Sequence, residues 1–146
     1  MEQAIDHNSL YRLPWNYADN AISWLEPTSA CNLRCEGCYR DTSRPQHKTL
    51  AQIEAEMNTF KRLRKSDCMS ITGGDPLVHP QITEIVKMAR EKGWKPIINT
   101  NGVALKQTLL ERLKRAGAFG FTFHIDTSQK RPRVRAKTEA DLNDVR

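Results

Sequence analysis

The sequence predicts an α/β fold in which parallel strands alternate with helices. Short apolar runs alternate with longer segments whose apolar residues recur at three- and four-residue steps, the period of a helix with one buried face. Glycine or proline stands at most junctions between these segments, where turns are expected. Strands that alternate with helices favour parallel pairing, because a parallel connection must cross the sheet and a helix makes that crossing.

The first strand and the first helix follow from local signals. We expect the strand at residues 21–25, ended by Pro27, because proline cannot donate to a sheet ladder. We expect the helix at residues 49–63, where the apolar side chains share one face. Thr49 and Gln52 have the spacing of a capping box at its start.

The remaining elements continue the alternation. Glycine follows each of the two further helices as a stop signal, and Pro80 lies early in the first of them, where proline is tolerated. The expected strands are 68–72, 96–100 and 120–126, and the expected helices are 79–92 and 106–116.

The two ends of the chain differ from this middle part. Residues 1–20 predict an irregular N-terminal extension, and residues 138–146 predict the first turns of a helix that the chain leaves incomplete. A fourth parallel strand at an open edge would expose unpaired backbone groups. We therefore expect the chain to be truncated, or to be one segment of a longer enzyme.

The composition excludes several classes of protein. Of the 146 residues, 38% are hydrophobic and 27% are charged, which is typical of globular domains rather than disordered chains. No stretch approaches the roughly 18 consecutive apolar residues of a membrane-spanning helix. The first residues lack the basic and apolar regions of a signal peptide. We therefore expect a cytoplasmic protein with no membrane segment.

The net charge of +6 permits an anionic partner without naming one. Part of the excess lies in a basic loop at residues 130–137, whose role stays open. The aromatic residues that a nucleic-acid binder interleaves with lysine and arginine are missing. Nucleic acid is therefore not expected as a partner.

Three of the four cysteines, Cys31, Cys35 and Cys38, lie within eight residues of one another. In a reducing compartment, clustered thiols bind metal or do redox chemistry. Three thiolates on a four-iron cluster would leave one iron free for a substrate or cofactor. The alternative is a structural zinc site completed by Cys68 or a histidine. We expect Cys68, at the start of an apolar strand, to be a core residue.

Polar residues gather where the predicted strands end. Glycines at positions 73 and 74 let the backbone approach a ligand closely, although Gly-Gly before Asp-Pro is also a plain turn. Asn99 and Asn101 share one face of the third strand. Thr122, His124 and Asp126 share one face of the fourth, where His124 and Asp126 could instead form a satisfied polar pair. These faces are expected to line a site, because a dry core would penalise them.

Taken in order, these motifs resemble the radical S-adenosylmethionine (radical SAM) superfamily. The C-x₃-C-x₂-C loop follows the first strand, Gly-Gly-Asp-Pro follows the second, and Thr-Asn-Gly closes the third. The resemblance covers residues 21–126. It implies the first four β-α units of a partial TIM-like barrel, and a core at residues 21–146 that is incomplete at its C-terminus, since the family core has six strands.

The resemblance implies two cofactors, a [4Fe-4S] cluster and S-adenosylmethionine, whose amino and carboxylate groups chelate the fourth iron. Tyr39 stands in for an aromatic residue that the family places before the last cysteine, a position occupied here by Gly37. Asp126 is expected to contact the ribose. The implied iron ligands are Cys31, Cys35 and Cys38, and the implied cofactor contacts are Tyr39, Gly73, Gly74, Asp75, Asn101, His124 and Asp126.

The implied activity is reductive cleavage of S-adenosylmethionine to a 5′-deoxyadenosyl radical that takes hydrogen from a substrate. The substrate, a small molecule or a peptide, is not readable from these residues. An electron donor such as a flavodoxin or a ferredoxin is implied as a partner. The alternative function is a non-catalytic α/β module that binds an iron–sulfur cluster or zinc.

Overall fold

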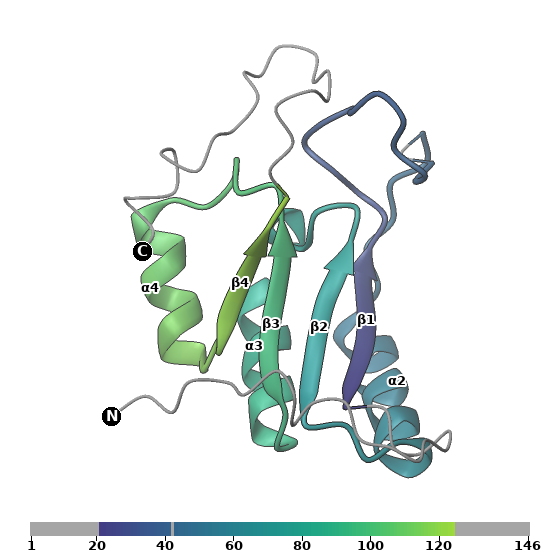
Figure 1. Ribbon diagram of the computed structural model, residues 1–146, viewed down its shortest axis with the longest axis vertical. Coiled ribbons are helices and arrows are strands. Elements are labelled where there is room, and N and C mark those ends of the chain that lie inside the picture. The colour runs from purple at the N-terminus through teal and green to yellow at the C-terminus, as the bar shows by residue number, and fades with distance from the viewer. Residues whose placement is uncertain (1–20, 42, 125–146) are drawn as a thin grey trace.

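Four parallel strands form one sheet in the order β1-β2-β3-β4, the order in which they occur along the chain (Figure 1). The computed structural model describes residues 21–41 and 43–124. The strands are β1 (Ile22–Thr28), β2 (Cys68–Gly73), β3 (Lys95–Thr100) and β4 (Gly120–Phe123). The helices are α2 (Leu50–Leu63), the 3₁₀ turn η1 (Pro76–Val78), α3 (Ile82–Glu91) and α4 (Gln107–Ala116). The predicted α/β fold, a partial barrel, is confirmed.

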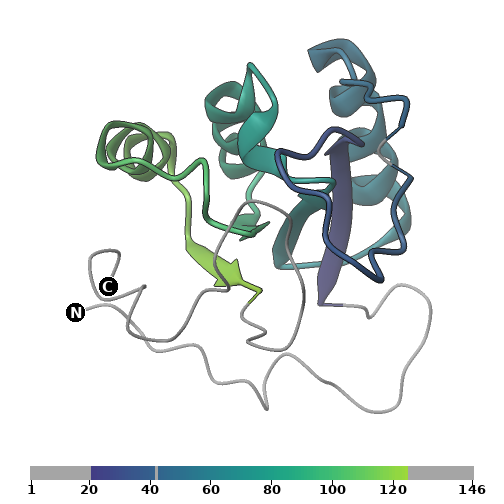
Figure 2. The ribbon, with the colours of Figure 1, turned by 90° about the horizontal axis from the view of Figure 1, so that it is seen from above.

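The three α-helices cover one face of the sheet (Figure 2). Leu25, Ile71 and Ile98 lie side by side across the paired strands and are fully buried on this face. Met57 of α2 and Leu113 of α4 pack into the same core. Burial of these side chains between sheet and helices is the main favourable term for the fold.

The opposite face of the sheet carries a different set of side chains. Residues paired in register in a parallel sheet lie on the same face, which here places Trp24 beside Ser70 and Asn99 beside Thr122. Trp24 is 58% exposed, and no helix of the described residues covers this face. The carboxyl ends of the strands, where barrel enzymes place their sites, lie at one edge together with residues 29–41 and 43–48.

Within the described residues the predicted elements are confirmed to within a few residues, with differences in β1, α3 and β4. Strand β4 ends at Phe123, and residues 125 and 126 of the predicted strand lie outside the described residues. The first difference concerns β1. This strand was expected to stop at Pro27, but it continues through Pro27 to Thr28. Its register with β2 is irregular between Leu25 and Thr28, and β1 is one of the two edge strands of the described sheet. A proline is tolerated at such an edge or bulge because no partner strand needs its missing N–H group.

Helix α3 begins at Ile82 rather than at residue 79, because the chain first makes the unpredicted turn η1. The Asp75 side chain accepts the Leu77 N–H and so caps this turn. Two other local predictions are confirmed. Both capping-box hydrogen bonds between Thr49 and Gln52 are present, and Gly117 ends α4 with a φ of 95°.

Several predictions fall outside the described residues. These concern the N-terminal extension (residues 1–20), Asp126, the basic loop (residues 130–137) and the last helix (residues 138–146). Within residues 21–41 and 43–124, no helix has both the length and the apolar character needed to span a membrane.

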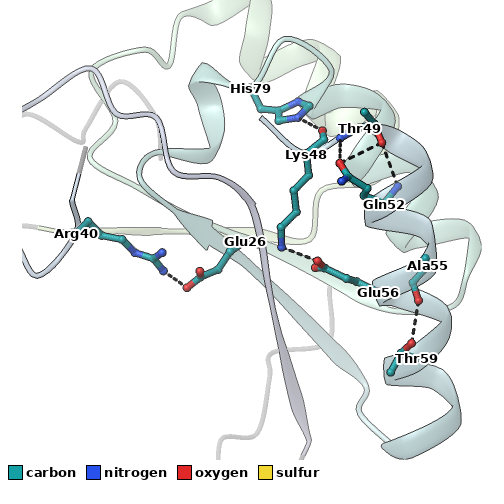
Figure 3. A network of polar contacts seen from close by, with 9 residues as sticks. All are labelled: Glu26, Arg40, Lys48, Thr49, Gln52, Ala55, Glu56, Thr59 and His79. Carbon is teal, nitrogen blue, oxygen red and sulfur yellow. Dashed lines mark hydrogen bonds and ion pairs between the residues drawn. The ribbon is translucent and has the colours of Figure 1, made fainter. Parts of the chain in front are cut away.

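His79 connects the end of η1 to the start of α2 (Figure 3). Its Nε2 lies 2.9 Å from the Lys48 carbonyl oxygen, and its Nδ1 accepts the Gln81 N–H at 3.1 Å. The imidazole is therefore neutral, with the proton on Nε2. Burial is the main cause that lowers the pKa of His79, and the nearby ring of His47 lowers it further, whereas the Lys48 carbonyl and Glu84 act in the opposite direction.

This lowered pKa predicts that stability falls in mild acid. The unfolded histidine takes up a proton near pH ~6.5, while the folded one resists protonation. The stability that neutral His79 contributes is therefore present above that pH and is lost as pH falls through the folded pKa. We expect the thermal midpoint of the protein to decrease between about pH 7.5 and 5.5, and to decrease less in His79→Gln. Equal slopes for the two proteins would contradict this role.

Candidate functional site

The segment that carries the cysteines leaves β1 at Thr28 and returns to it at His47. The Thr28 hydroxyl donates to the Gln46 carbonyl at 2.9 Å and accepts the Ala30 N–H at 2.9 Å. The Ser29 N–H also donates to the Gln46 carbonyl. These bonds close the base of the loop over the carboxyl end of the sheet, so the cysteines between them are held at that edge.

The glycine turn after β2 packs directly against the start of this loop. The Gly74 N–H donates to the Thr28 carbonyl at 2.9 Å, and the Asp75 N–H donates to the Ala30 carbonyl at 2.8 Å. A Cβ atom at Gly74 would lie 2.1 Å from the Ala30 oxygen, and one at Gly73 would lie 2.2 Å from the Thr28 oxygen. Glycine is therefore required here for contact with the chain itself as well as for access to a ligand.

Asp75 is buried, with 1% of its surface exposed, and its carboxylate accepts hydrogen bonds from two segments. The Thr100 hydroxyl lies 2.8 and 3.0 Å from the two carboxylate oxygens. The Asn101 N–H donates at 2.8 Å, and the Leu77 N–H at 2.9 Å. Asp75 thus ties the end of β3 to the glycine turn after β2, and its side chain points into this network.

Cys31, Cys35 and Cys38 line two cavities, of about 290 and 520 Å³. The Cys31 Sγ accepts the Leu33 N–H at 3.4 Å and lies 3.7 Å from the Asn101 Nδ2. Burial raises the pKa of Cys31 most, the Leu33 N–H lowers it, and the negative charges of Asp75 and the other two cysteines raise it further. A bound cation would oppose this increase, because a metal ligand must be the thiolate.

The surroundings of Cys31 contain groups that suit an iron–sulfur cluster. Three thiols line the same cavity, and three thiolates can ligate a four-iron cluster. Among the described residues, no group of three or more Cys, His, Asp or Glu side chains is close enough to bind one metal ion. The N–H groups directed at the Cys31 sulfur also suit a cluster thiolate, whose charge they offset.

Cys68 lies at the other end of the sheet, which removes it as a fourth ligand. It pairs with Ile22 and Lys95, the first residues of β1 and β3, and it is buried. Its prediction as a core residue is confirmed. Of the histidines, His79 uses both ring nitrogens in hydrogen bonds, and His47 Nδ1 is bonded to the Thr28 hydroxyl.

The structure brings most of the predicted site residues together around the larger cavity. Asp75 does not line it, because its side chain points toward Thr100, and Asp126 lies outside the described residues. Thr72, Asn99 and Thr122 add polar groups from the open face of the sheet. The predicted residues that line the cavity are Cys31, Cys35, Cys38, Tyr39, Gly73, Gly74, Asn101 and His124.

Several lining residues were not predicted as site residues, and three of them bring side chains from different elements. Trp24 and Thr100 reach the cavity from β1 and β3, and Arg40 reaches it from the loop. Arg40 pairs with Glu26 of β1 (Figure 3). Its guanidinium group also lies over the Tyr39 ring, 5.1 Å from the ring centroid. Trp24 could have been found from strand alternation, since it faces away from buried Leu25, but the Arg40–Glu26 pair has no local signal.

Comparison with known proteins agrees with this geometry. A family model described as the Radical SAM superfamily matches residues 25–145. The GTP 3′,8-cyclase of Chlorobaculum tepidum is 37% identical over 107 residues, which are 68% of this chain and 31% of the cyclase. The chain therefore spans less than a third of that relative.

Two solved structures share the fold. BtrN in complex with AdoMet and 2-DOIA superposes with a TM-score of 0.62 at 23% identity, over 85% of this chain and 50% of BtrN. Streptococcus suis SuiB bound to S-adenosylmethionine superposes with a TM-score of 0.59 at 21% identity, over 73% of this chain and 24% of SuiB. At these identities the likeness shows the fold alone.

The close approach at Gly74 predicts a large cost for Gly74→Ala. The added methyl would overlap the Ala30 carbonyl, which is backbone and cannot rotate away. We expect a loss of at least about 2 kcal/mol in the free energy of unfolding, measured by urea denaturation. The matched control is Gly120→Ala, where nothing lies within 4 Å of the added Cβ, and it should change stability by less than about 0.5 kcal/mol. Similar effects in both variants would contradict the proposed contact.

The hydrogen bonds of Asp75 predict that Asp75→Asn is also destabilising. An amide in place of the carboxylate loses an acceptor and turns an N–H₂ group toward the N–H of either Asn101 or Leu77. We expect a loss of about 3 kcal/mol, read from the urea midpoint at unchanged slope. Glu91→Gln, which breaks only an exposed ion pair with Lys87, is the control and should cost less than about 0.5 kcal/mol. A neutral Asp75→Asn would show that the carboxylate is not needed.

Proposed function

Because this chain belongs to the radical SAM superfamily, we propose that Cys31, Cys35 and Cys38 hold a [4Fe-4S] cluster, with S-adenosylmethionine beside it in the larger cavity. Members of the superfamily bind these two cofactors, so the cofactor prediction is confirmed at the level of the family. One observation carries the proposal: the cysteine loop and the glycine turn line one cavity of about 520 Å³ at the carboxyl ends of parallel strands.

When bound and reduced, the cluster supplies the electron that cleaves S-adenosylmethionine to methionine and a 5′-deoxyadenosyl radical, which abstracts hydrogen from the substrate. The residues of this chain would bind the two cofactors and orient them. Three thiolates leave one iron open for the cofactor. The main chain of Gly73 and Gly74 borders the same cavity and can hold a polar head group.

The open face of the sheet would hold the rest of the cofactor. Asn99, Thr122 and His124 offer polar groups for a ribose or a base, and Tyr39 and Trp24 offer aromatic surface. Tyr39 is 83% exposed, which leaves it free to pack on a bound adenine. The side chain of Asp75 supports the glycine turn and the end of β3 in this scheme, so that the methionine contact falls to the main chain. Asp126 remains a predicted ribose contact.

Partners and substrate follow from the same site. Cys38 is exposed, so an external reductant such as a flavodoxin or a ferredoxin could approach the cluster closely. The substrate would be a small molecule or a peptide in the cytoplasm. One of the fold neighbours, SuiB, was solved with a precursor peptide bound.

A second candidate is a module that binds an iron–sulfur cluster without turnover. The cysteine loop alone would be enough for it, because three thiolates can hold a cluster whether or not a substrate is bound. Catalysis, in contrast, needs the substrate to be held as well as the cofactor. The zinc alternative is weaker, because Cys68 lies at the far end of the sheet.

Anaerobic reconstitution of the full chain with iron and sulfide tests the proposal. We expect about four irons per chain, a spectrum that shifts when S-adenosylmethionine is added, and release of deoxyadenosine after reduction. Replacing Cys31, Cys35 or Cys38 with alanine should abolish loading, whereas Cys68→Ser, at a buried thiol away from the loop, should retain it.

The outcomes of this experiment distinguish the enzyme, the module without turnover and the zinc site. Cluster binding without deoxyadenosine supports the module that binds without turnover. One zinc at full occupancy, with no iron uptake, would contradict the cluster. Loss of iron in Cys68→Ser to the same degree as in Cys31→Ala would contradict the ligand assignment.

A further inference from the structure

The side chain of Asn101 joins the end of β3 to the cysteine loop. Its Nδ2 lies 2.8 Å from the Asn32 Oδ1 and 3.7 Å from the Cys31 Sγ. Its Oδ1 accepts the Val103 N–H at 2.9 Å. Because the Val103 bond requires the amide oxygen on its side, the N–H₂ group must face the loop.

The backbone of Asn101 is held just as firmly. Its N–H donates to the carboxylate of Asp75 at 2.8 Å, and that carboxylate is buried. Main chain and side chain are therefore both fixed, and the amide can point at the sulfur without a large loss of rotamer freedom on binding. Among the described residues, no side-chain N–H group donates to the sulfur of Cys35 or Cys38, so Cys31 differs from them in this respect.

We propose that Asn101 is a positioning residue that donates an N–H···S hydrogen bond to Cys31 and thereby raises the reduction potential of the cluster. This inference rests on the proposed function, since it assumes that Cys31 is an iron ligand. A donor to a thiolate sulfur offsets negative charge, and so favours the reduced, more negative state of the cluster. The Leu33 N–H already donates to the same sulfur at 3.4 Å, and Asn101 adds a second donor from the end of β3.

The Asn101 amide contacts Asn32 as well as the sulfur of Cys31. Asn32 lies next to Cys31, so the Asn101 amide holds the first turn of the cysteine loop as well as the sulfur. Loss of the amide should therefore weaken retention of the cluster. Replacing a residue that hydrogen-bonds to a metal ligand typically lowers the metal affinity by about 10- to 100-fold.

Two variants of the full chain test the inference. Asn101→Asp keeps the oxygen that accepts the Val103 N–H but lacks the donor. Asn101→Ser is neutral, can still accept that N–H, and is too short to reach the sulfur. After anaerobic reconstitution, we expect both to have a more negative midpoint potential than wild type, measured by redox titration with electron paramagnetic resonance and without S-adenosylmethionine. We also expect both to lose iron to a chelator roughly tenfold faster.

The matched control is Asn99→Ser, which removes an amide from the same cavity whose donor faces Ser70 rather than a sulfur. Its midpoint potential should equal that of wild type. Because the titration detects only molecules that hold a cluster, a partly folded variant still reports its potential.

Three results would overturn the inference. The first is an unchanged potential in both Asn101 variants. The second is a shift in Asn101→Asp alone, which would assign the effect to the added charge. The third is weaker binding of S-adenosylmethionine at an unchanged potential, which would make Asn101 a direct cofactor contact. A wild-type chain that takes up no iron would contradict the proposed function itself, whereas these three results leave it standing.

Discussion

The arrangement of the site depends on the buried carboxylate of Asp75. It accepts the Thr100 hydroxyl and the N–H groups of Leu77 and Asn101, and so joins the turn after β2 to the end of β3. A carboxylate without partners would be costly in this position, and donors from two segments make it stable. The same residue's N–H group donates to the Ala30 carbonyl, which brings the start of the cysteine loop to the same point.

Contact between the glycine turn and the loop explains why three separate motifs act as one site. Gly74 approaches the Ala30 oxygen so closely that no side chain fits between them. Asn101 then reaches the loop from β3 through Asn32. The cysteines therefore stand against the carboxyl ends of three neighbouring strands, the place where α/β folds bind their ligands. His79, which is bonded to Lys48, fixes the far end of the returning segment.

The sequence predicted well what local physical chemistry determines. The alternation of elements, the capping box at Thr49 and the helix stop at Gly117 depend on neighbours in the chain, and the structure confirms them. The end of β1 was wrong because tolerance of Pro27 depends on the edge position of the strand, which is a property of the sheet. The turn η1 was missed because its cap, Asp75, was interpreted only as a ligand contact.

The same distinction between local and long-range contacts applies to the candidate site. The predicted residues that line the larger cavity followed from motif order, because cysteine spacing and strand alternation are visible in the sequence. Their roles as ligand contacts stay predictions. The bonds that hold those residues in place join positions about 25 to 70 residues apart, such as Thr100 to Asp75 and Asn101 to Cys31. The spacing of apolar residues along the sequence does not indicate such long-range pairs. Cysteine spacing can therefore suggest a metal ligand, but a residue that contacts its sulfur, such as Asn101, is found only when the strands are brought side by side.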